Sequence, residues 1–505
     1  MNPNRFAPRL RSVAAAGVLA LSAHATSAQV LELAMDASPV GLDPHLVTAF
    51  QSFMVVNGTI YEGLTAIDKD LRVRPGLAES WSVSADGKTY TFRIRRGVSF
   101  HNGAAMDARD AAASLRRVMS KDISSPLASR LAAVEQISTP DNNTVVVALK
   151  EPSAPLLVSL ATLAIVPRNF ENDKDSLQRQ PMGTGPFKFR EWQTNNFIAL
   201  DKHAGYWRTG SPKVDGVKFS IVPESATRQV GLGSGQYAML PNIDAATAMQ
   251  VRNRPNVQLR ETLELAYSLI GMNVSRPPFN DVRVRQALNY ALNRAEIVQA
   301  ALFGAGVPGG PLSPALKDWA LNVSEYPCYA HNPQRAMELL KAAGHNAPLA
   351  VTLTVLPRQD IKDMAQVVQQ QLNKAGFKVE LKNPELGQFI QDWRNSNFDL
   401  FASTNAGSPD PDDYFFRTFR TGGSTNVFKY TNPELDGMLD RARAGTDEAV
   451  RKRNYAQVQR MLACDGPIAH VAYGQLFTAM RNNVQGFDII ANRSLSSLGG
   501  VSLAR

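Results

Sequence analysis

The sequence predicts an α/β protein with more than one domain, on three observations. Strand and helix patterns alternate between Leu349 and Ser403, which is typical of an α/β domain. A hairpin of two antiparallel strands is indicated between Arg74 and Arg96. The chain has 505 residues, too many for a single hydrophobic core, so we expect two or three domains.

The hairpin is the clearest local pattern in the chain. Asp86-Gly87 lies at its centre and supplies the positive φ angles that a two-residue turn needs. After the turn, Tyr90, Phe92 and Ile94 alternate with polar residues. One face of this strand is therefore apolar, and we expect it to pack on a core.

The other elements of the first half are shorter. A helix is expected over 107–119, with Asp107 as its N-cap. A second β pair is expected over 133–149. The remaining expected elements are strands at 31–36, 187–190, 198–201 and 217–222 and a helix at 226–235.

The second half carries longer helical patterns. Val284, Ala287, Leu288, Ala291 and Leu292 form one apolar stripe, which predicts a single helix from about 280 to about 301. The remaining expected elements are strands at 266–273, 349–356, 377–381, 398–403 and 470–479 and helices at 333–343, 361–375 and 447–464.

The first 28 residues have the pattern of a cleavable secretory signal. Three arginines and no acidic residue precede a short apolar run at 13–21, and Thr26-Ser27-Ala28 places small residues at the cleavage site. The apolar run is too short to span a bilayer, and no cysteine follows the cleavage site. We therefore expect a periplasmic protein that begins at Gln29 and is not a lipoprotein.

The net charge does not indicate a nucleic-acid partner. Subtracting the three leader arginines from the net charge of +9 leaves +6 for the mature chain. No run of Lys and Arg is interleaved with aromatic residues, as a nucleic-acid surface requires.

Cys328 and Cys464 are the two cysteines of the chain. An even pair in an exported protein favours a disulfide, and two buried free thiols are the alternative. The bridge would close a loop of 136 residues, for which chain entropy gives roughly 4–5 kcal/mol as an upper figure.

Motifs of catalysis and of cofactor binding are missing from the sequence. It contains no HExxH, GxSxG or GxxxxGK pattern, and 231–235 lacks the third glycine of a dinucleotide fingerprint. The six histidines of the mature chain are scattered, with none at metal-ligand spacing. We therefore expect no enzyme, no cofactor and no metal site.

Seven short segments, each weakly informative alone, form one ordered pattern along the mature chain. They are Tyr61–Leu64, Leu77–Arg95, Gly97–Gly103, Gly183–Phe187, Gly205–Trp207, Pro278–Ala287 and Asp410–Asp412. In this order and at this spacing, they resemble the extracytoplasmic solute-binding proteins of ABC importers. The resemblance is to family 5, the peptide/nickel cluster, which includes oligopeptide-, dipeptide-, glutathione- and nickel-binding members.

The resemblance implies a two-lobed periplasmic-binding-protein fold, type II-like (cluster C), with an extra subdomain inserted in lobe I. The implied boundaries are 29–60, 180–265 and 474–505 for lobe I, 61–179 for the inserted subdomain and 266–473 for lobe II. Hinge strands would lie near Leu265–Met272 and Val471–Phe477. Ligand would be enclosed when the lobes close.

The resemblance also implies a function. The chain would be a monomer that captures a small solute, a short peptide or peptide-like compound, and delivers it to an inner-membrane ABC permease. One alternative is a receptor of the same fold for glutathione, a nickel chelate, an opine or a sugar. An exported hydrolase is a further alternative, which the missing catalytic motifs disfavour.

The loop from Thr404 to Asp412 departs from the resemblance. In members that bind peptides, an aspartate before the Asp-Pro motif receives the ligand's α-ammonium, because a buried cation needs a compensating carboxylate. That position falls here on Gly407 or Ser408, and Asn405 stands where tryptophan is common. Asp410 is a candidate replacement; alternatively, it is a turn residue before proline.

Four further residues are candidate ligand contacts, each with a structural alternative. Trp393 stacks on ligand or anchors a core, and Tyr267 faces either the cleft or the core. Thr184 lies in a glycine-rich turn whose N–H groups can bind a carboxylate or simply form the turn. Pro39 belongs to a loop at the mouth of lobe I.

Overall fold

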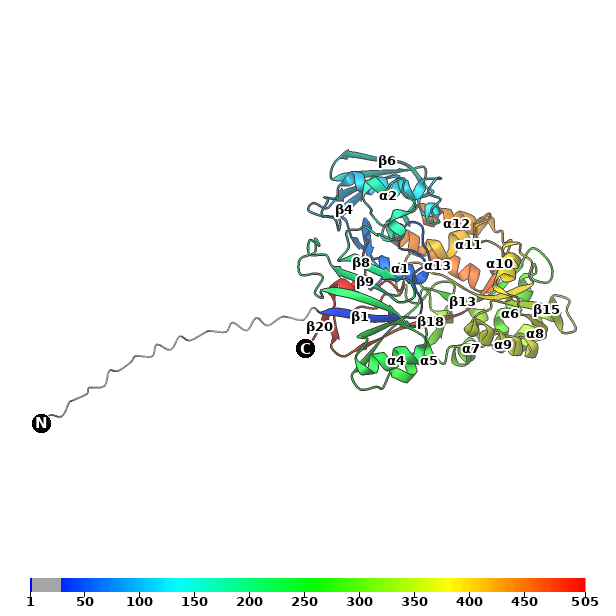
Figure 1. Ribbon diagram of the computed structural model, residues 1–505. Helices are drawn as coiled ribbons and strands as arrows, with labels where there is room; N and C mark the ends of the chain where they lie inside the picture. The colour runs from blue at the N-terminus through cyan, green and yellow to red at the C-terminus, as the bar shows by residue number, and fades with distance from the viewer. Residues whose placement is uncertain (2–28, 505) are drawn as a thin grey trace.

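The computed structural model describes Met1 and residues 29–504, so the expected cleavage site lies outside the described residues. A sheet of 12 strands runs through the molecule, with helices on both sides (Figure 1). Smaller antiparallel sheets lie beside it. This mixture of parallel and antiparallel strands with packed helices confirms the α/β class.

One half of the long sheet forms the part that we call lobe I. Its first strand, β1 (Val30–Met35), runs parallel to β10 (Gly216–Ile221) and to β11 (Met239–Ile243). Lobe I also contains β8 (Phe187–Gln193), β9 (Phe197–Lys202), β12 (Val257–Leu263) and the helices α1 (Phe50–Val56), α4 (Ser225–Ser234) and α5 (Ala245–Val251).

The other half of the long sheet forms lobe II. Its strands are β13 (Tyr267–Met272), β14 (Gly306–Pro308), β15 (Leu349–Val355), β16 (Phe377–Lys382) and β17 (Leu400–Asn405). Its helices are α6 (Val282–Ala291), α7 (Arg294–Ala301), α8 (Pro333–Ala342), α9 (Gln359–Lys374), α10 (Leu386–Arg394), α11 (Asp412–Phe419), α12 (Pro433–Ala444) and α13 (Glu448–Asp465).

The prediction of a single helix from about 280 to 301 is wrong, because the structure has two helices there, α6 and α7. Leu292 takes an extended conformation with ψ at 118°, which ends α6. Asn293 then caps α7, because its side chain accepts a hydrogen bond from the Glu296 amide. Asparagine is among the strongest N-cap residues, and it begins a new helix although the apolar stripe continues.

The 14-residue strand β18 (Ile468–Arg481) joins the two lobes. Its first part pairs with β13 up to Ala472, and its last part pairs with β12 from Gln475 onward. The chain makes its other direct crossing between β12 and β13, at 264–266. Two neighbouring backbone connections therefore cross between the lobes at the same level of the sheet.

The strands from β2 (Thr65–Ile67) to β7 (Thr144–Leu149) belong to the part that we call the inserted subdomain, which contains the predicted hairpin. Strand β4 (Ala78–Val83) pairs antiparallel with β5 (Thr89–Ile94), and Gly87 in the turn has φ at 70°. Tyr90, Phe92 and Ile94 are buried in the core of the subdomain, as the alternation predicts. The four-stranded sheet has the order β4-β5-β7-β6, where β6 is Val134–Asp141.

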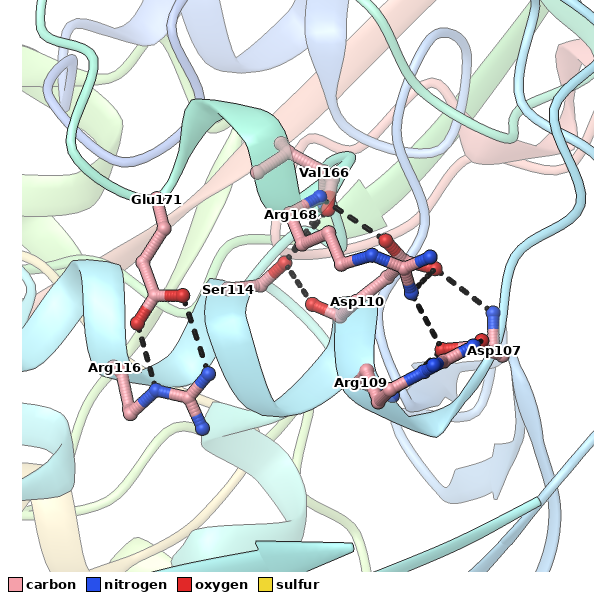
Figure 2. Close-up of polar contacts among 8 residues, drawn as sticks. All are labelled: Asp107, Arg109, Asp110, Ser114, Arg116, Val166, Arg168 and Glu171. Atoms are coloured by element: carbon pink, nitrogen blue, oxygen red, sulfur yellow. Dashed lines mark hydrogen bonds and ion pairs between the residues drawn. The ribbon is translucent and has the colours of Figure 1, made fainter. Parts of the chain in front are cut away.

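Helix α2 (Ala108–Met119) covers this sheet, and Asp107 is its N-cap, as predicted. Figure 2 shows how α2 is attached to the segment 166–171. Arg168 pairs with Asp107 at 3.0 Å, and Arg116 pairs with Glu171 at 2.7 Å. These polar contacts hold the subdomain's helix against the chain that returns to lobe I.

The disulfide between Cys328 and Cys464 is present, as the exported compartment predicts. It links the short turn at Pro327–Tyr329 to the end of α13. No helix of the described residues is long and apolar enough to cross a membrane.

Because His470 on β18 is buried, we expect the free energy of unfolding to depend on pH. Neither ring nitrogen has a hydrogen-bond partner among the described residues. Burial, reinforced by the charge of Arg294, lowers the pKa of His470 from 6.5 to about 3. Below pH 6.5 the unfolded chain binds a proton there that the folded protein does not, so acidification favours unfolding.

We therefore expect His470→Leu to flatten the dependence of unfolding free energy on pH. Between pH 7.5 and pH 5 the wild type should lose about 2 kcal/mol more than the variant, at 1.36 kcal/mol per pH step below 6.5. Urea titrations at the two pH values measure this difference. Equal losses in the two proteins would show that His470 is already charged in the folded state.

Candidate functional site

A hollow of about 1410 Å³ lies where lobe I, lobe II and the inserted subdomain meet. Tyr90 and Leu157 line it from the subdomain, Phe487 from lobe I, and Trp319 and Arg451 from lobe II. A smaller hollow of about 410 Å³ shares Lys69, Asp70 and Asp488 with it. Pockets for small ligands typically measure about 300–1,000 Å³, so the larger hollow has room for a short peptide.

Charged side chains of both signs line the larger hollow in equal number. The basic residues are Lys69, Arg72, Arg74, Arg260, Lys317 and Arg451. The acidic residues are Asp70, Glu261, Asp318, Asp410, Glu448 and Asp488. Three of the basic residues pair with three of the acidic ones, as Lys69–Asp70, Arg72–Asp318 and Arg451–Asp410, so the lining has no excess of either sign.

Asp410 lines this hollow, but its carboxylate is already hydrogen-bonded to other residues of the protein. Arg451 donates to both carboxylate oxygens, at 2.8 and 3.0 Å, and both side chains are buried. The Asp412 amide also donates to Asp410, at 2.8 Å. Asp410 therefore closes the turn before Pro411 and attaches it to α13, which is a structural role.

Gly407 stands at a position with no room for a side chain. A Cβ atom there would lie 2.0 Å from the Tyr414 hydroxyl oxygen and 2.1 Å from the Leu265 carbonyl oxygen. That hydroxyl donates to the same carbonyl at 2.6 Å. The space beside Gly407 is thus filled by an internal hydrogen bond, and an aspartate is sterically excluded.

We expect Gly407→Asp to lower the free energy of unfolding by about 2–3 kcal/mol, because overpacking forces neighbouring atoms to move. Chemical denaturation measures the change. Gly387→Asp is the matched control: nothing lies within 4 Å of its added Cβ, so it should change stability by less than about 0.5 kcal/mol. Equal effects of the two substitutions would contradict this steric account.

Asn405, at the end of β17, lies opposite Tyr267 on β13, and Ser408 follows in the loop after β17. The Asn405 amide donates to the Tyr267 hydroxyl at 3.1 Å, and both belong to paired strands. Tyr267 is buried among aromatic rings, with Tyr473 and His470 at 5.8 and 5.1 Å between centroids. The ring of Tyr267 therefore faces the core, while Asn405 and Ser408 remain half-buried.

Thr184 is fully buried and donates to Glu62 at 3.0 Å. Tyr206 and Trp207 donate to the same carboxylate, at 2.8 and 3.0 Å. Burial raises the pKa of Glu62, and these three hydrogen bonds oppose the rise. Three of the ordered sequence segments thus meet at one carboxylate, which borders the smaller hollow.

The N–H groups beside Thr184 are used inside the protein. The Gly185 amide donates to the Ile60 carbonyl at 2.9 Å, and the Gly183 amide donates to His101 at 3.4 Å. The glycines are required there because an added Cβ would lie 2.1–2.3 Å from backbone carbonyl oxygens. The turn therefore fits the tight junction of lobe I and the subdomain.

Trp393 and Pro39 lie outside both hollows. Trp393 is half-buried on α10 and packs on the core of lobe II. Pro39 is buried, and its neighbour Val40 is 75% exposed. Of the residues predicted from sequence, Asp410 alone lines the larger hollow.

Sequence reasoning did not find Tyr90, Trp319, Arg451 and Phe487, which line the larger hollow. They come from four segments far apart in the chain. The alternation predicts that Tyr90 packs on a core, and in the structure Tyr90 both belongs to the subdomain core and borders the hollow. Spacing along the sequence carries no signal for residues that meet only through tertiary structure.

Two lobes joined by crossing strands, with a hollow lined by both, define the class of two-lobed solute-binding proteins. The chain belongs to the bacterial extracellular solute-binding proteins, family 5, whose middle-region model matches residues 72–426. It is accordingly a binding protein and not an enzyme.

Individual relatives extend this similarity over nearly the whole chain. The dipeptide-binding protein of Escherichia coli K12 is 28% identical over 502 residues, covering 92% of this chain and 93% of its own. HbpA2 from Haemophilus parasuis is 25% identical, with a TM-score of 0.85 over 94% of this chain and 100% of its own. AgaA from A. tumefaciens R10, in complex with agropinic acid, is 25% identical, with a TM-score of 0.78 over 94% and 99%.

Proposed function

We propose that the protein is the periplasmic substrate-binding component of an ABC importer and captures a short peptide or peptide-like solute. The observation that carries this is the hollow itself, which both lobes and the inserted subdomain line together. A solute there would contact all three parts only when they are closed around it. Its binding energy would therefore favour the closed arrangement.

The hinge in this proposal consists of the two crossings, at 264–266 and near Tyr473-Gly474 of β18. The lobes then have the boundaries inferred from sequence: lobe I at 29–60, 180–265 and 474–505, the subdomain at 61–179, and lobe II at 266–473. Rotation about a few residues at the ends of strands is the usual form of such closure.

A non-peptide solute is the second candidate, and Gly407 is the observation that favours it. The exclusion of a carboxylate there removes the anchor that a peptide's α-ammonium needs. Agropinic acid, the compound bound by AgaA, is an example of a non-peptide solute on this fold.

The proposed function also includes export of the protein and delivery of its solute. The leader would be cleaved before Gln29 without lipid attachment, and the mature monomer would hand its solute to an inner-membrane permease. N-terminal sequencing of the periplasmic protein, with its intact mass and its mass in solution, tests these points. A lipid-modified or uncleaved chain would contradict them.

Ligand-induced thermal stabilisation without turnover tests the proposed function. The panel comprises dipeptides, glutathione and agropinic acid, each added to purified protein. We expect a rise in Tm with at least one member, because binding to the folded state alone stabilises it, and unchanged solute afterwards. Product formation would indicate the exported hydrolase instead.

A further inference from the structure

A third hollow, of about 480 Å³, lies within lobe II, and we call it the lobe II hollow. It is lined by residues of β15, of 382–384 and of 392–399, and by Arg276. None of these residues also lines the larger or the smaller hollow. Its volume lies within the range of about 300–1,000 Å³ that is typical of small-ligand pockets. It is therefore a separate candidate site, which the proposed function does not use.

One side of the lobe II hollow is the face of β15 that is turned away from the core. Val351 and Leu353 are buried in the core of lobe II, so the alternate residues Thr352 and Thr354 project from the opposite face. Thr354 is the register partner of Lys382 on the parallel strand β16. The side chains of Thr354 and Lys382 therefore lie next to each other on this face, and both line the hollow.

Helix α10 packs on the same face of the sheet. The Phe389 ring on α10 lies 6.4 Å from the Phe401 ring on β17, and Phe401 is the register partner of Thr354 on the other side of β15. Asp392, one turn further along α10, lines the hollow. The hollow thus lies between α10 and the two strands β15 and β16, of which β16 is the edge strand of the sheet.

Arg276 and Asp399 form an ion pair in the wall of the hollow. The Asp399 carboxylate accepts from the Thr352 hydroxyl at 2.9 Å and from the Thr352 amide at 3.1 Å, and Nη2 of Arg276 lies 3.2 Å from it. The same Nη2 donates to the Phe398 carbonyl at 3.0 Å. Among residues 29–504, Nε and Nη1 of Arg276 have no hydrogen-bond partner, so donors remain for a ligand.

Two opposite charges at the hollow have no ionic partner. Within residues 29–504, neither Lys382 nor Asp392 forms an ion pair at 4.0 Å or less. Asp392 accepts from the amides of Gln388 and Asn397, each at 3.0 Å and both on Oδ1, so Oδ2 has a free acceptor. Thr354 is 5% exposed, and its hydroxyl has no hydrogen-bond partner in the same part of the chain.

We propose that the lobe II hollow binds a small zwitterion, an α-amino acid with a free ammonium and a free carboxylate. Lys382 and the remaining N–H groups of Arg276 bind the carboxylate, and Asp392 binds the ammonium, since charge-assisted hydrogen bonds are the strong ones. The Thr354 hydroxyl binds a polar atom of the ligand. A ligand with only one of the two charges leaves the opposite protein charge without a partner, so the site selects against it.

Occupancy of this site does not require closure of the lobes. Every residue that lines the hollow belongs to lobe II as its boundaries are proposed above, from 276 to 399. Rotation of one lobe against the other leaves these residues in place relative to one another. The zwitterion therefore binds independently of the solute in the larger hollow.

Equilibrium dialysis with radiolabelled L-glutamine tests the site on the wild type, Lys382→Gln, Asp392→Asn and Thr354→Val. The matched control is Lys378→Gln, an exposed lysine on the same strand and the same face that does not line the hollow. Two analogues lack one charge each: N-acetyl-L-glutamine has no ammonium, and L-glutaminamide has no carboxylate. Binding that remains in Lys382→Gln/Asp392→Asn measures occupancy of any other site and is subtracted, and circular dichroism checks the fold of each variant.

We expect Lys382→Gln and Asp392→Asn each to weaken glutamine binding by roughly fivefold, as for partly exposed ion pairs. Thr354→Val should weaken it less, and Lys378→Gln should leave it unchanged. The wild type should prefer glutamine to both analogues, and Asp392→Asn should lose the preference over the N-acetyl form.

Three results would overturn the site: no glutamine binding by the wild type, equal binding by the wild type and the Lys382 and Asp392 variants, or equal binding of glutamine and its N-acetyl form by the wild type. The proposed function stands or falls separately, because its solutes are tested in the larger hollow by thermal stabilisation.

Discussion

Asp43→Asn is expected to lower the free energy of unfolding by about 3–5 kcal/mol, because it leaves a buried guanidinium without its counter-charge. Asp43 follows β1 in lobe I, and Arg117 lies on α2 of the inserted subdomain. The pair is bidentate, at 3.1 and 2.6 Å, and both side chains are 0% exposed. His45 accepts a further hydrogen bond from Arg117 at 3.0 Å.

This cluster attaches the subdomain to lobe I. Urea denaturation followed by tryptophan fluorescence measures the loss. The control is the double variant Asp43→Asn/Arg117→Met, which removes the orphaned charge and should recover at least about 1.5 kcal/mol of stability. A single variant within about 1 kcal/mol of the wild type would show that water or a rearrangement satisfies Arg117.

Removal of the disulfide is expected to cost about 2–5 kcal/mol, with a loop of 136 residues released in the unfolded chain. The bridge lies within lobe II, at the start of the segment before α8 and at the end of α13. Cys328→Ala/Cys464→Ala tests it by chemical denaturation under non-reducing conditions.

Reduction of the wild type with dithiothreitol should shift its denaturation midpoint toward that of the double variant, and it should leave the variant itself unchanged. A double variant as stable as the oxidised wild type would contradict the stabilising role of the bridge. Two titratable thiols in denatured, non-reduced protein would contradict the bridge itself.

The parts of the fold that could be predicted from the sequence are those determined by residues close together in the chain. The hairpin at 78–94 follows from Asp86-Gly87 and an alternation of period two, and α2 begins at its predicted cap. The prediction of one helix through Leu292 was wrong because Asn293 caps a new helix there, although the apolar stripe continues. The pairing of β18 with strands of both lobes has no local signature, since its 14 residues are nearly all buried.

The candidate site was less predictable, because its residues meet only in the folded chain. The sequence shows that Gly407 replaces the aspartate of the peptide-binding members. It does not show the hydrogen bond from the Tyr414 hydroxyl to the Leu265 carbonyl that leaves no room for a side chain there. Asp410 was found, while its partner Arg451, 41 residues further on, was missed.

Native mass spectrometry of the periplasmically expressed protein tests the central claim most directly. We predict a population carrying one small solute per chain, which dissociates unchanged when the protein is denatured and can be identified by its fragment masses. A protein that is empty as isolated, and that is neither loaded nor stabilised by peptides, glutathione or agropinic acid, would contradict the account.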